Sequence, residues 1–369
     1  MIKILFLIHD LGHGGAEKVL VNLVNNMDPG RFDISVTALF GGINRQFLAP
    51  HVRCRVIFPN VFPGNSQVMK LLTPQQLHRL FIPERYDIEV SYLEGACARI
   101  ISGCTAPGTK KVCWIHIEQR TKKRAAASFR SSREALECYG RFDRIICVSD
   151  AVRKDFLELL PVAVQTEVLR NTNEAGKILT SVGDAVEDGL FSDREIRLVG
   201  VGKLVKHKGF HRLIPMVKKL RDAGHPVHLY ILGTGPMEQA LKHLAAGLGV
   251  SDAVTLLGYR INPYKYVAKC DLFYCASLAE GFSTAATESL IVGTPVCTVE
   301  VSGMKELLGE HNEWGIVTEN DDSALYEGVR RLLDDPALLA HYRGRAAERG
   351  KTFSTEDSVS AVQDMLCGL

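Results

Sequence analysis

The sequence has few of the features that assign a protein to a class at first sight. Its 369 residues include ten cysteines, yet no C-x-x-C occurs and no group of cysteine and histidine residues has the spacing of a zinc site, so we expect no metal. No run approaches the ~20 apolar residues of a membrane-spanning helix. The apolar stretch at residues 2–8 lacks a basic leading region and a small-residue cleavage site, which favours a strand over a signal peptide. We therefore expect a cytoplasmic protein.

The sequence also has little net charge. Lys and Arg number 44 against 42 Asp and Glu, a net of +2, whereas a protein that coats nucleic acid usually carries a larger basic excess. The charge is uneven, however. Residues 1–175 carry 23 basic and 17 acidic side chains, and residues 176–369 carry 21 and 25. The first half is therefore basic and the second acidic. Because the net charge of the whole chain is small, we expect no nucleic-acid partner.

The cysteines are better explained as core residues than as disulfides. Five of them lie in apolar, strand-like runs: Cys113, Cys147, Cys270, Cys275 and Cys297. In such runs a thiol behaves as a small hydrophobic group. We expect reduced thiols and a reducing compartment.

Short β-branched runs alternate with longer amphipathic stretches along the whole chain. The predicted strands are residues 3–8, 33–39, 54–58, 88–92, 111–117, 144–148 and 166–169 in the first half, and 196–202, 227–232, 254–257, 272–275, 295–299 and 315–318 in the second. Helical patterns lie between them, for example at 16–27 and 151–159, and three more follow the last strand, at 323–333, 336–350 and 355–366. Strands alternating with helices indicate parallel sheets covered on both faces, so each half predicts a doubly wound α/β domain.

A polar stretch marks the boundary between the two series. It includes Asp184, Glu187, Asp188 and Asp193 and has little apolar periodicity. We expect a first domain at residues 1–175, a linker or surface excursion at 176–195, a second domain at 196–352 and a terminal helix at 353–369. The sequence shows no solenoid repeat and no low-complexity tract.

Basic side chains gather in one stretch of the first half. Between positions 110 and 133 the one acidic residue is Glu118, and the basic ones are Lys110, Lys111, Arg120, Lys122, Lys123, Arg124, Arg130 and Arg133. Such a group attracts phosphates or anionic lipid headgroups, each charge near a membrane surface contributing about 1 kcal/mol. A solvated helix start is the alternative for a single basic run.

Glycine turns follow predicted strands in both halves. In the first half, Gly12-His13-Gly14-Gly15 lies between a strand and a helix, where backbone N–H groups can approach an anion. The dinucleotide fingerprint needs a third glycine where Glu17 stands, which argues against NAD. In the second half, Gly233-Thr234-Gly235-Pro236 is a second turn of close approach.

Two further motifs of the second half carry charge at strand ends. The loop after residue 201 supplies Lys203 and Lys208, which could reach one diphosphate at the carboxyl edge of the sheet. A later loop brings Glu280, small residues that open a helix with free amides, and Glu288 one to two turns on.

In this order the motifs resemble those of the retaining glycosyltransferases of family 4, which have the GT-B fold. The resemblance spans nearly the whole chain and rests on Gly14-Gly15-Ala16-Glu17, Trp114-Ile115-His116, Gly202-Lys203 with Lys208-Gly209, Gly233-Thr234-Gly235-Pro236, the E-x7-E pair Glu280 and Glu288, and Gly303-x-x-Glu306. It implies two Rossmann-like α/β domains facing a central crevice. The first would bind an acceptor and the second a nucleotide sugar, and the terminal helix would cross back to the first domain.

The resemblance implies roles for individual residues. Lys203, where the family commonly has arginine, and Lys208 would bind the donor diphosphate and stabilise the departing nucleotide. Glu280 would contact the transferred sugar, and His116 would face the sugar and the reacting phosphate. The other donor-binding residues would be Gly14, Gly15, Gly202, Gly233, Gly235, Tyr259, Arg260, Gly281, Phe282, Ser283, Thr284 and Glu288, the last as ribose ligand.

The resemblance also implies an activity. We expect retaining transfer of a sugar from a nucleotide diphosphate donor, UDP by the family's usual preference, to a hydroxyl of a glycan or polyprenyl-linked glycan, without a metal or other cofactor. The basic stretch could rest peripherally on the anionic inner face of the plasma membrane. A sugar-nucleotide epimerase and a binding-only sugar-nucleotide module of the same fold remain as alternatives, and a dehydrogenase is disfavoured by Glu17.

Overall fold

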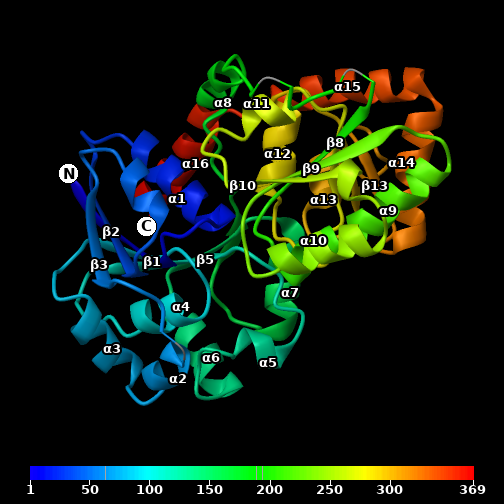
Figure 1. The fold of residues 1–369 in the computed structure, drawn as a ribbon. Coiled ribbons are helices and arrows are strands. Elements are labelled where there is room, and N and C mark those ends of the chain that lie inside the picture. Colours follow the sequence, from blue (N-terminus) through cyan, green and yellow to red (C-terminus); the bar gives the residue numbers. More distant parts are fainter. Residues whose placement is uncertain (63, 188, 193) are drawn as a thin grey trace. The chain divides into compact units, whose positions relative to one another are not determined.

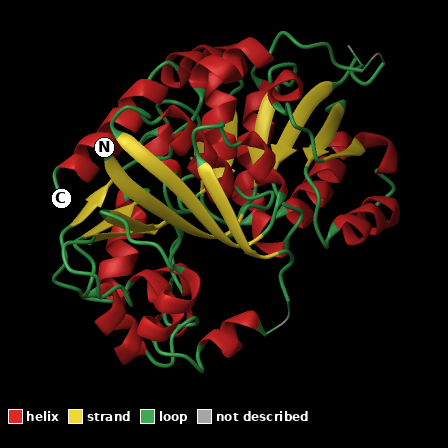
Figure 2. Ribbon diagram, turned by 90° about the vertical axis from the view of Figure 1, so that its left-hand side faces the viewer, coloured by secondary structure: helices red, strands yellow, loops and turns green. Residues whose placement is uncertain are grey.

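The computed structural model describes residues 1–62, 64–187, 189–192 and 194–369. The chain forms two compact units, one of Met1–Asn173 with Thr355–Leu369 and one of Glu174–Ser354. We call them unit 1 and unit 2. Each is built on its own parallel sheet, with helices on both faces (Figures 1 and 2).

Unit 1 is built on a seven-stranded sheet. Its strand order is β3-β2-β1-β4-β5-β6-β7, and every neighbouring pair is parallel. The strands are β1 (Ile2–Asp10), β2 (Phe32–Phe40), β3 (Arg53–Phe58), β4 (Ile88–Ser91), β5 (Lys110–Ile115), β6 (Arg144–Cys147) and β7 (Thr166–Val168). The helices are α1 (Gly15–Asn26), η1 (Ile43–Phe47), α2 (Asn65–Met69), α3 (Pro74–Phe81), α4 (Ala96–Ile101), α5 (Lys122–Ala125), α6 (Ser132–Tyr139), α7 (Asp150–Leu159) and α16 (Thr355–Cys367).

Unit 2 is built on a six-stranded parallel sheet of order β10-β9-β8-β11-β12-β13. The strands are β8 (Ile196–Val201), β9 (Val227–Leu232), β10 (Val254–Gly258), β11 (Leu272–Cys275), β12 (Val296–Val299) and β13 (Ile316–Thr318). The helices are α8 (Ala175–Ser181), η2 (Lys206–Lys208), α9 (Phe210–Asp222), α10 (Glu238–Gly247), η3 (Ser251–Ala253), α11 (Tyr264–Val267), α12 (Thr284–Ile291), α13 (Met304–Leu308), α14 (Asp322–Asp334) and α15 (Pro336–Gly350).

The apolar strand sequences account for the position of both sheets at the centre of their units. All side chains from Ile4 to Ile8 of β1 are fully buried, as are Leu198 and Val199 of β8. A strand covered by helices on both faces needs such a continuous apolar run, because neither face meets water. Burial of this surface supplies the main favourable contribution to folding.

The strand order of each sheet reverses once. In unit 1 the reversal lies between β1 and β4, and in unit 2 between β8 and β11. At each reversal the connections leave the two strands in opposite directions, which opens a crevice at their carboxyl ends. Doubly wound proteins bind ligands in this crevice. The topology therefore predicts that ligands bind at the loops after β1 and β4 in unit 1 and after β8 and β11 in unit 2.

The last helix returns to unit 1. Thr355 Oγ1 donates to the carbonyl of Asn173 at 2.8 Å, and the backbone N of Asp28 donates to Gln363 Oε1 at 2.8 Å. Val359, Val362 and Leu366 are buried. The expectation that the C-terminal helix crosses back to the first domain is confirmed.

All thirteen predicted strands are present, with ends displaced by at most two residues. The segment 176–195, in contrast, is more structured than a polar linker. It contains most of α8, whose Ile178 packs with Tyr264 and Ile291 in one apolar cluster. Asn262 Nδ2 also donates to the carbonyl of Ser181 at 2.7 Å. Positions 188 and 193 of this segment lie outside the described residues.

All ten cysteines are free thiols. Cys113, Cys147, Cys270 and Cys297 are buried as expected, whereas Cys275 is partly exposed and lines a pocket described below. Among the residues that the structure describes, no helix has the length and apolarity needed to cross a membrane.

Candidate functional site

A buried ion pair lies at the reversal point of unit 2. Lys208 Nζ, on η2 after β8, is 2.7 and 2.8 Å from the two carboxylate oxygens of Glu280, in the loop after β11. Ser277 Oγ donates to Glu280 Oε1 at 2.7 Å. Glu280 is 7% exposed, so its charge is compensated almost entirely by these two neighbours. The structure thus brings together the cation and the acid that the sequence places 72 positions apart.

The pair faces a small pocket at the ends of β8 and β11. Its lining includes Lys208, Phe210, Cys275, Ser277, Glu280 and Ser283. Burial by itself would lower the pKa of Lys208, but the Glu280 carboxylate outweighs it and raises that pKa above its ordinary value. Lys208 therefore remains a cation at neutral pH and can attract a phosphate.

Glycine permits the loops around this pair to pack closely. Gly209 has a φ of +73°, and a Cβ there would lie 1.9 Å from the carbonyl oxygen of Ala276. The backbone N of Leu278 donates to the carbonyl of His207 at 2.7 Å. These contacts join the loop after β8 to the loop after β11 and hold Lys208 against Glu280.

Arg212 of α9 reinforces the same junction. It is buried and donates to the Ala276 carbonyl, to Asn320 Oδ1 and to Asp322 Oδ1 at 2.8, 2.8 and 2.6 Å. No sequence pattern indicated Arg212, because its position inside a helix resembles that of any surface arginine. Its guanidinium ties the loop after β11 to the start of α14.

The glycine turn after β9 packs on the loop after β8. A Cβ on Gly233, after β9, would lie 1.9 Å from the carbonyl oxygen of Gly202, and one on Gly235 would lie 2.5 Å from that of Leu204. The backbone N of Leu204 donates to the carbonyl of Thr234 at 2.9 Å. The glycines thus support the loop that carries Lys203 and Lys208, of which Lys203 is half-buried.

The predicted acidic loop continues into helix α12. Ser283 is the N-cap residue and accepts a hydrogen bond from the backbone N of Ala286 at 3.4 Å. Gly281, Phe282 and Ser283 are buried, and Thr284 is partly exposed. The free amides of the first turn face the end of the loop, where they can hold an anion.

Glu288 is buried on α12 beside Tyr264, whose hydroxyl donates to Glu288 Oε1 at 3.4 Å. Gly303, with a φ of +76°, lies against the same loop, because a Cβ there would be 2.4 Å from the Gly281 carbonyl oxygen. The loops after β11 and β12 are therefore adjacent, and both E-x7-E acids lie on the one that includes α12.

Two of the predicted donor-binding residues, Tyr259 and Arg260, follow β10. Tyr259 and Arg260 are half-buried, and Arg260 pairs with Glu187 at 3.6 Å and lies over the Tyr266 ring at 5.7 Å. Its Nε is buried without a hydrogen-bond partner. Glu187, which accepts from the Tyr266 hydroxyl, comes from the segment predicted as a linker.

In unit 1, Gly14 caps α1 and Gly15 is its first residue, directly after β1. The Glu17 carboxylate folds over Gly14, since a Cβ on Gly14 would lie 1.8 Å from Glu17 Oε2. Asn44 supports this turn by donating to the Gly12 carbonyl. The turn therefore lies at the carboxyl end of the strand that begins the reversal.

His116 follows β5 and has a buried Nε2 without a hydrogen-bond partner. Burial lowers the pKa of His116 to about 3, so the ring is neutral at pH 7. Its backbone N donates to Glu94 Oε2 at 2.9 Å, and burial raises the pKa of Glu94. Groups with strongly shifted pKa values gather at functional sites, which makes both residues candidates. Glu94 was not among the predicted residues, although an acid three residues after β4 at the reversal point could have indicated it.

The structure divides the basic stretch. Lys110 and Lys111 begin β5, whereas Arg120, Lys122, Lys123 and Arg124 follow its other end, so the strand separates the two groups by about 15 Å. Lys110 pairs with Asp143, and Arg120 pairs with Glu118. The basic stretch is therefore divided by β5 into two groups, and Lys122, Lys123 and Arg124 of α5 form an exposed group of their own.

Comparison with known families supports the fold and the motifs. The family profile described as Glycosyltransferase Family 4 matches residues 13–172, and that described as Glycosyl transferases group 1 matches residues 184–351. The two matches adjoin near the boundary between the units.

Curated relatives include glycosyltransferases of bacteria. The chain is 34% identical over 232 residues to N-acetylgalactosamine-N,N'-diacetylbacillosaminyl-diphospho-undecaprenol 4-alpha-N-acetylgalactosaminyltransferase of Campylobacter jejuni. It is 29% identical over 163 residues to the lipopolysaccharide core biosynthesis glycosyltransferase LpsD of Rhizobium meliloti. These matches cover 62% and 44% of this chain and span only 60% and 46% of the relatives' own lengths.

Solved structures of the same architecture cover the whole chain. HepE of Anabaena in complex with UDP-glucose superposes with a TM-score of 0.79 at 20% identity, covering 100% of both chains. TarM of S. aureus superposes with a TM-score of 0.77 at 13% identity, covering 99% of both. These likenesses establish the two-domain GT-B fold. With both profiles matched in order along one chain, this protein belongs to the family 4, group 1 glycosyltransferases.

Proposed function

We propose that this protein transfers a sugar, with retention of anomeric configuration, from a nucleotide diphosphate sugar to a hydroxyl group of a glycan. The proposal rests on one observation above the others. A lysine and an acid from separate loops, Lys208 and Glu280, meet beside the amides of α12 at the strand-order reversal of unit 2. A pocket with a fixed cation, helix amides and buried carboxylates suits a diphosphate joined to a polyhydroxyl ligand.

In the proposed complex, unit 2 holds the donor. Lys208 and Lys203 contact the diphosphate, with the α12 amides on the phosphate nearest the sugar. Glu280 and Glu288 are buried carboxylates that accept hydrogen bonds, so they suit the hydroxyls of the sugar and of the ribose. Binding requires Lys208 to exchange one Glu280 oxygen for a phosphate oxygen, which leaves Glu280 free to accept from the sugar.

The proposed reaction breaks the bond between the anomeric carbon and the diphosphate oxygen. Negative charge develops on that oxygen, and cations already in position stabilise it without reorganisation. The leaving phosphate then accepts the proton of the acceptor hydroxyl, which attacks on the same face. Neutral His116 bonds the Tyr92 backbone through its other ring nitrogen, so its unsatisfied Nε2 would accept a hydrogen bond from a sugar hydroxyl.

Two features of the donor chemistry belong to the same proposal. Because lysines supply the charge that Mg²⁺ provides in other transferases, we propose that transfer needs no metal. We also propose UDP as the nucleotide. HepE and TarM, which share the fold, have been solved with UDP.

We propose a lipid-linked glycan as the acceptor, bound by unit 1 at a membrane surface. Five of the exposed large apolar side chains lie between positions 61 and 80: Val61, Phe62, Val68, Leu71 and Leu80. We call them the apolar group. The Campylobacter relative acts, by its name, on an undecaprenol-linked substrate. Apolar side chains beside cations suit an anionic membrane, which contributes about 1 kcal/mol per lysine or arginine near the surface.

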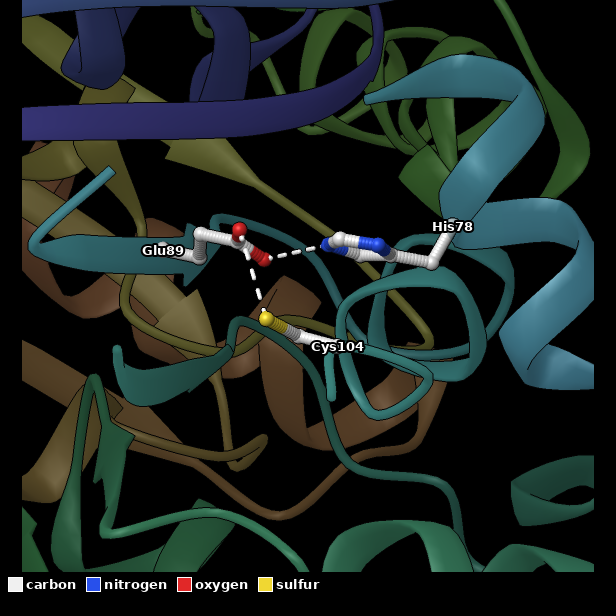
Figure 3. Close-up of side chains that lie close together, drawn as sticks. All are labelled: His78, Glu89 and Cys104. Carbon is white, nitrogen blue, oxygen red and sulfur yellow. Dashed lines mark hydrogen bonds and ion pairs between the residues drawn. The ribbon is translucent and has the colours of Figure 1, made fainter. Parts of the chain in front are cut away.

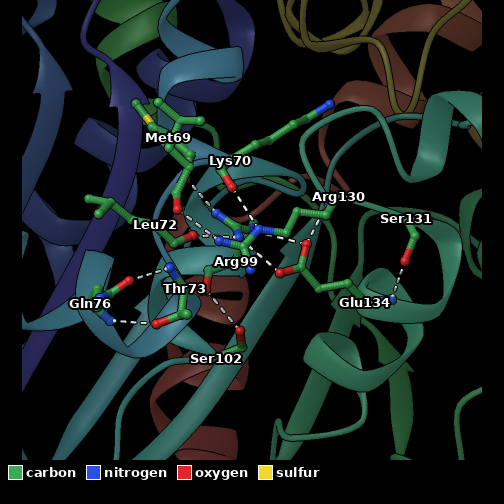
Figure 4. Close-up of polar contacts among 11 residues, drawn as sticks. Met69, Lys70, Leu72, Thr73, Gln76, Arg99, Ser102, Arg130, Ser131 and Glu134 are labelled. Atoms are coloured by element: carbon green, nitrogen blue, oxygen red, sulfur yellow. Dashed lines mark hydrogen bonds and ion pairs between the residues drawn. The ribbon is translucent and has the colours of Figure 1, made fainter.

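Two arginines hold the end of α2, and with it Leu71 of the apolar group, in place (Figure 4). Arg99 donates to the carbonyls of Met69 and Leu72 at 2.8 Å each, and Arg130 donates to those of Lys70 and Leu71 at 2.6 and 2.9 Å. Glu134 accepts from Arg99 at 2.8 Å. Four consecutive carbonyls at the end of α2 are thus capped, so Leu71 can be 78% exposed on a well-supported turn.

Donor binding is tested by thermal shift with UDP-, GDP- and ADP-sugars, followed by transfer assays with and without EDTA. A ligand at 100 times its Kd adds about 2.7 kcal/mol. We expect UDP-sugars to stabilise the wild type and Lys206→Ala, whose lysine is an exposed neighbour, but not Lys208→Ala. NMR of the product should show the donor's anomeric configuration. Nucleotide binding without transfer to any acceptor would instead support a binding module.

Membrane contact is tested by co-sedimentation with anionic and neutral vesicles. Replacing Lys122 and Lys123 by Gln removes two charges, which should lower partition into anionic vesicles by about 30-fold and have little effect on neutral ones. Leu71→Ser should weaken binding to both kinds of vesicle. Leu179→Ser, at an exposed leucine of unit 2, should weaken binding to neither. Binding that is insensitive to lipid charge and to salt would contradict the proposal.

A further inference from the structure

Three side chains capable of binding a metal meet inside unit 1, at a place the donor chemistry does not use (Figure 3). They are His78 on α3, Glu89 on β4 and Cys104 after α4, and one ligand atom from each lies within 4.8 Å of the others. His78 Nε2 is 2.8 Å from Glu89 Oε2, and Cys104 Sγ is 3.5 Å from Glu89 Oε1. The three residues are 9%, 1% and 8% exposed.

This cluster is separate from the carboxyl edge of the sheet. Glu89 is the second residue of β4, whereas Glu94 and the crevice follow the strand's last residue. Doubly wound sheets bind substrates at the carboxyl edge, so the cluster is not part of the proposed donor or acceptor site. Its residues are also absent from the motifs that carry the family resemblance.

The backbone holds the three elements together with little freedom. Gly103 packs directly on α3, because a Cβ there would lie 2.0 Å from the carbonyl oxygen of Pro74. Pro74 is fixed in turn by the capping box of Thr73 and Gln76, visible in Figure 4. The close approach at Gly103 places the next residue, Cys104, beside His78. The cluster is therefore preformed, which removes much of the entropic cost of assembling a ligand set.

We propose that His78, Glu89 and Cys104 bind one Zn²⁺ ion as a structural site. Imidazole nitrogen, carboxylate oxygen and thiolate sulfur are the three zinc ligand types, whereas Mg²⁺ and Ca²⁺ require oxygen sets. The two Glu89 oxygens point to different partners, one to His78 and one to Cys104. A bidentate carboxylate would thus bring the donor atoms to four, the number that structural zinc sites use.

Charge also favours a divalent ion at this position. A carboxylate and a thiolate together balance Zn²⁺, so the loaded cluster is neutral, as a buried site should be. The ion would join α3, β4 and the segment after α4. Linear spacing could not reveal this site, because the ligands are 11 and 15 positions apart and come from different elements.

The full-length protein, stripped with a chelator and dialysed, provides the test. Titration with Co²⁺ as the probe should give about one equivalent bound and a near-ultraviolet thiolate-to-cobalt charge-transfer band, which Zn²⁺ then abolishes. Zn²⁺ alone should raise the Tm of the wild type. Cys104→Ser should remove the band and lower Zn²⁺ affinity by more than the 10–100-fold typical of losing a supporting residue. His78→Gln should lower the affinity similarly.

Matched cysteine variants make the assignment specific. Cys138→Ser removes another buried thiol of unit 1, and Cys367→Ser removes the exposed thiol; both should keep the band and the Zn²⁺ shift. A wild-type protein that binds Co²⁺ without a thiolate band, or not at all, overturns the proposal even if Cys104→Ser fails to fold. Loss of the band in Cys367→Ser, with retention in Cys104→Ser, overturns it as well.

Discussion

For the Lys208–Glu280 pair we predict that a second substitution restores the stability lost by the first but does not restore sugar transfer. Lys208→Met removes the cation and keeps most of the side-chain volume. Glu280 then remains buried with only Ser277 to donate to it. Removing one member of a buried pair costs about 3–5 kcal/mol. Because Lys208 is 27% exposed and water can replace part of its charge, we expect about 2 kcal/mol.

A second substitution, Glu280→Gln, tests whether the loss of stability comes from the uncompensated Glu280 charge. In the Lys208→Met background, Glu280→Gln removes the uncompensated charge, so it should restore about 1–2 kcal/mol, although the same change destabilises the wild type. A double-mutant cycle in urea measures this coupling. For a unit of this size, 2 kcal/mol corresponds to a Tm change of about 4–8 °C. Lys206→Met, at the exposed neighbouring lysine, should leave the stability within about 0.5 kcal/mol.

Activity should not follow the restored stability. The double variant lacks both the phosphate cation and the sugar-binding acid, so sugar transfer should stay at the level of the less active single variant or below. A coupling energy near zero would refute the pair as an interaction present in solution. A double variant that regained both stability and transfer would refute the assignment of Lys208 to the donor diphosphate.

Three further predictions concern other parts of the chain. The pKa of His116 is lowered to about 3 in the folded protein from 6.5 in the unfolded chain. Below pH 6.5 the unfolded state therefore binds more protons, and the free energy of unfolding falls. Between pH 7 and pH 5 the free energy of unfolding, measured in urea, should fall by about 2 kcal/mol less in His116→Gln than in the wild type. Gly209→Ala should cost at least about 2 kcal/mol more than Gly249→Ala, since both glycines have positive φ but only the first would clash with backbone; equal losses would contradict the close packing. Glu134→Gln removes the anion beside the buried arginine of α4 and should cost about 3 kcal/mol, whereas Glu137→Gln breaks an exposed pair and should cost under about 0.5 kcal/mol by the same measurement.

The periodicity of the sequence was sufficient to predict the two sheets. Strands such as β11, at Leu272–Cys275, are uninterrupted apolar runs, and helix packing on both faces requires such a pattern. The motif residues Lys208 and Glu280 could be predicted as separate strand-end charges, because parallel strands end at one edge. Their direct pairing follows from the β8–β11 adjacency, which the strand order alone decides.

Other features have no signature in the linear sequence. The basic stretch appeared continuous because its lysines are close in the sequence, yet β5 carries Lys110 to one edge and Lys122 beyond the other. Arg212 and Ser277 act through contacts between separate loops, which no local pattern marks. The segment that contains α8 appeared to be a linker because its apolar residues follow no helical or strand period, whereas buried Ile178 packs it against Tyr264 and Ile291 of unit 2.

The net charge of the second half of the chain has the same sign as its proposed ligand. Residues 176–369 have four more acids than bases, yet the proposed ligand of this half is a diphosphate. Exposed charges more than about 8–10 Å away are screened at physiological salt, so the net charge of a domain hardly affects a phosphate in a pocket. The groups that lie close to the pocket determine whether a phosphate binds there. Lys208 is fixed and cationic, and the α12 amides point to the same loop. In the structure Glu280 pairs with Lys208 and keeps the cation in place, and in the proposed complex a phosphate competes for it. The same carboxylate would then accept from sugar hydroxyls, so by this proposal one ion pair prepares the pocket for both ends of the donor.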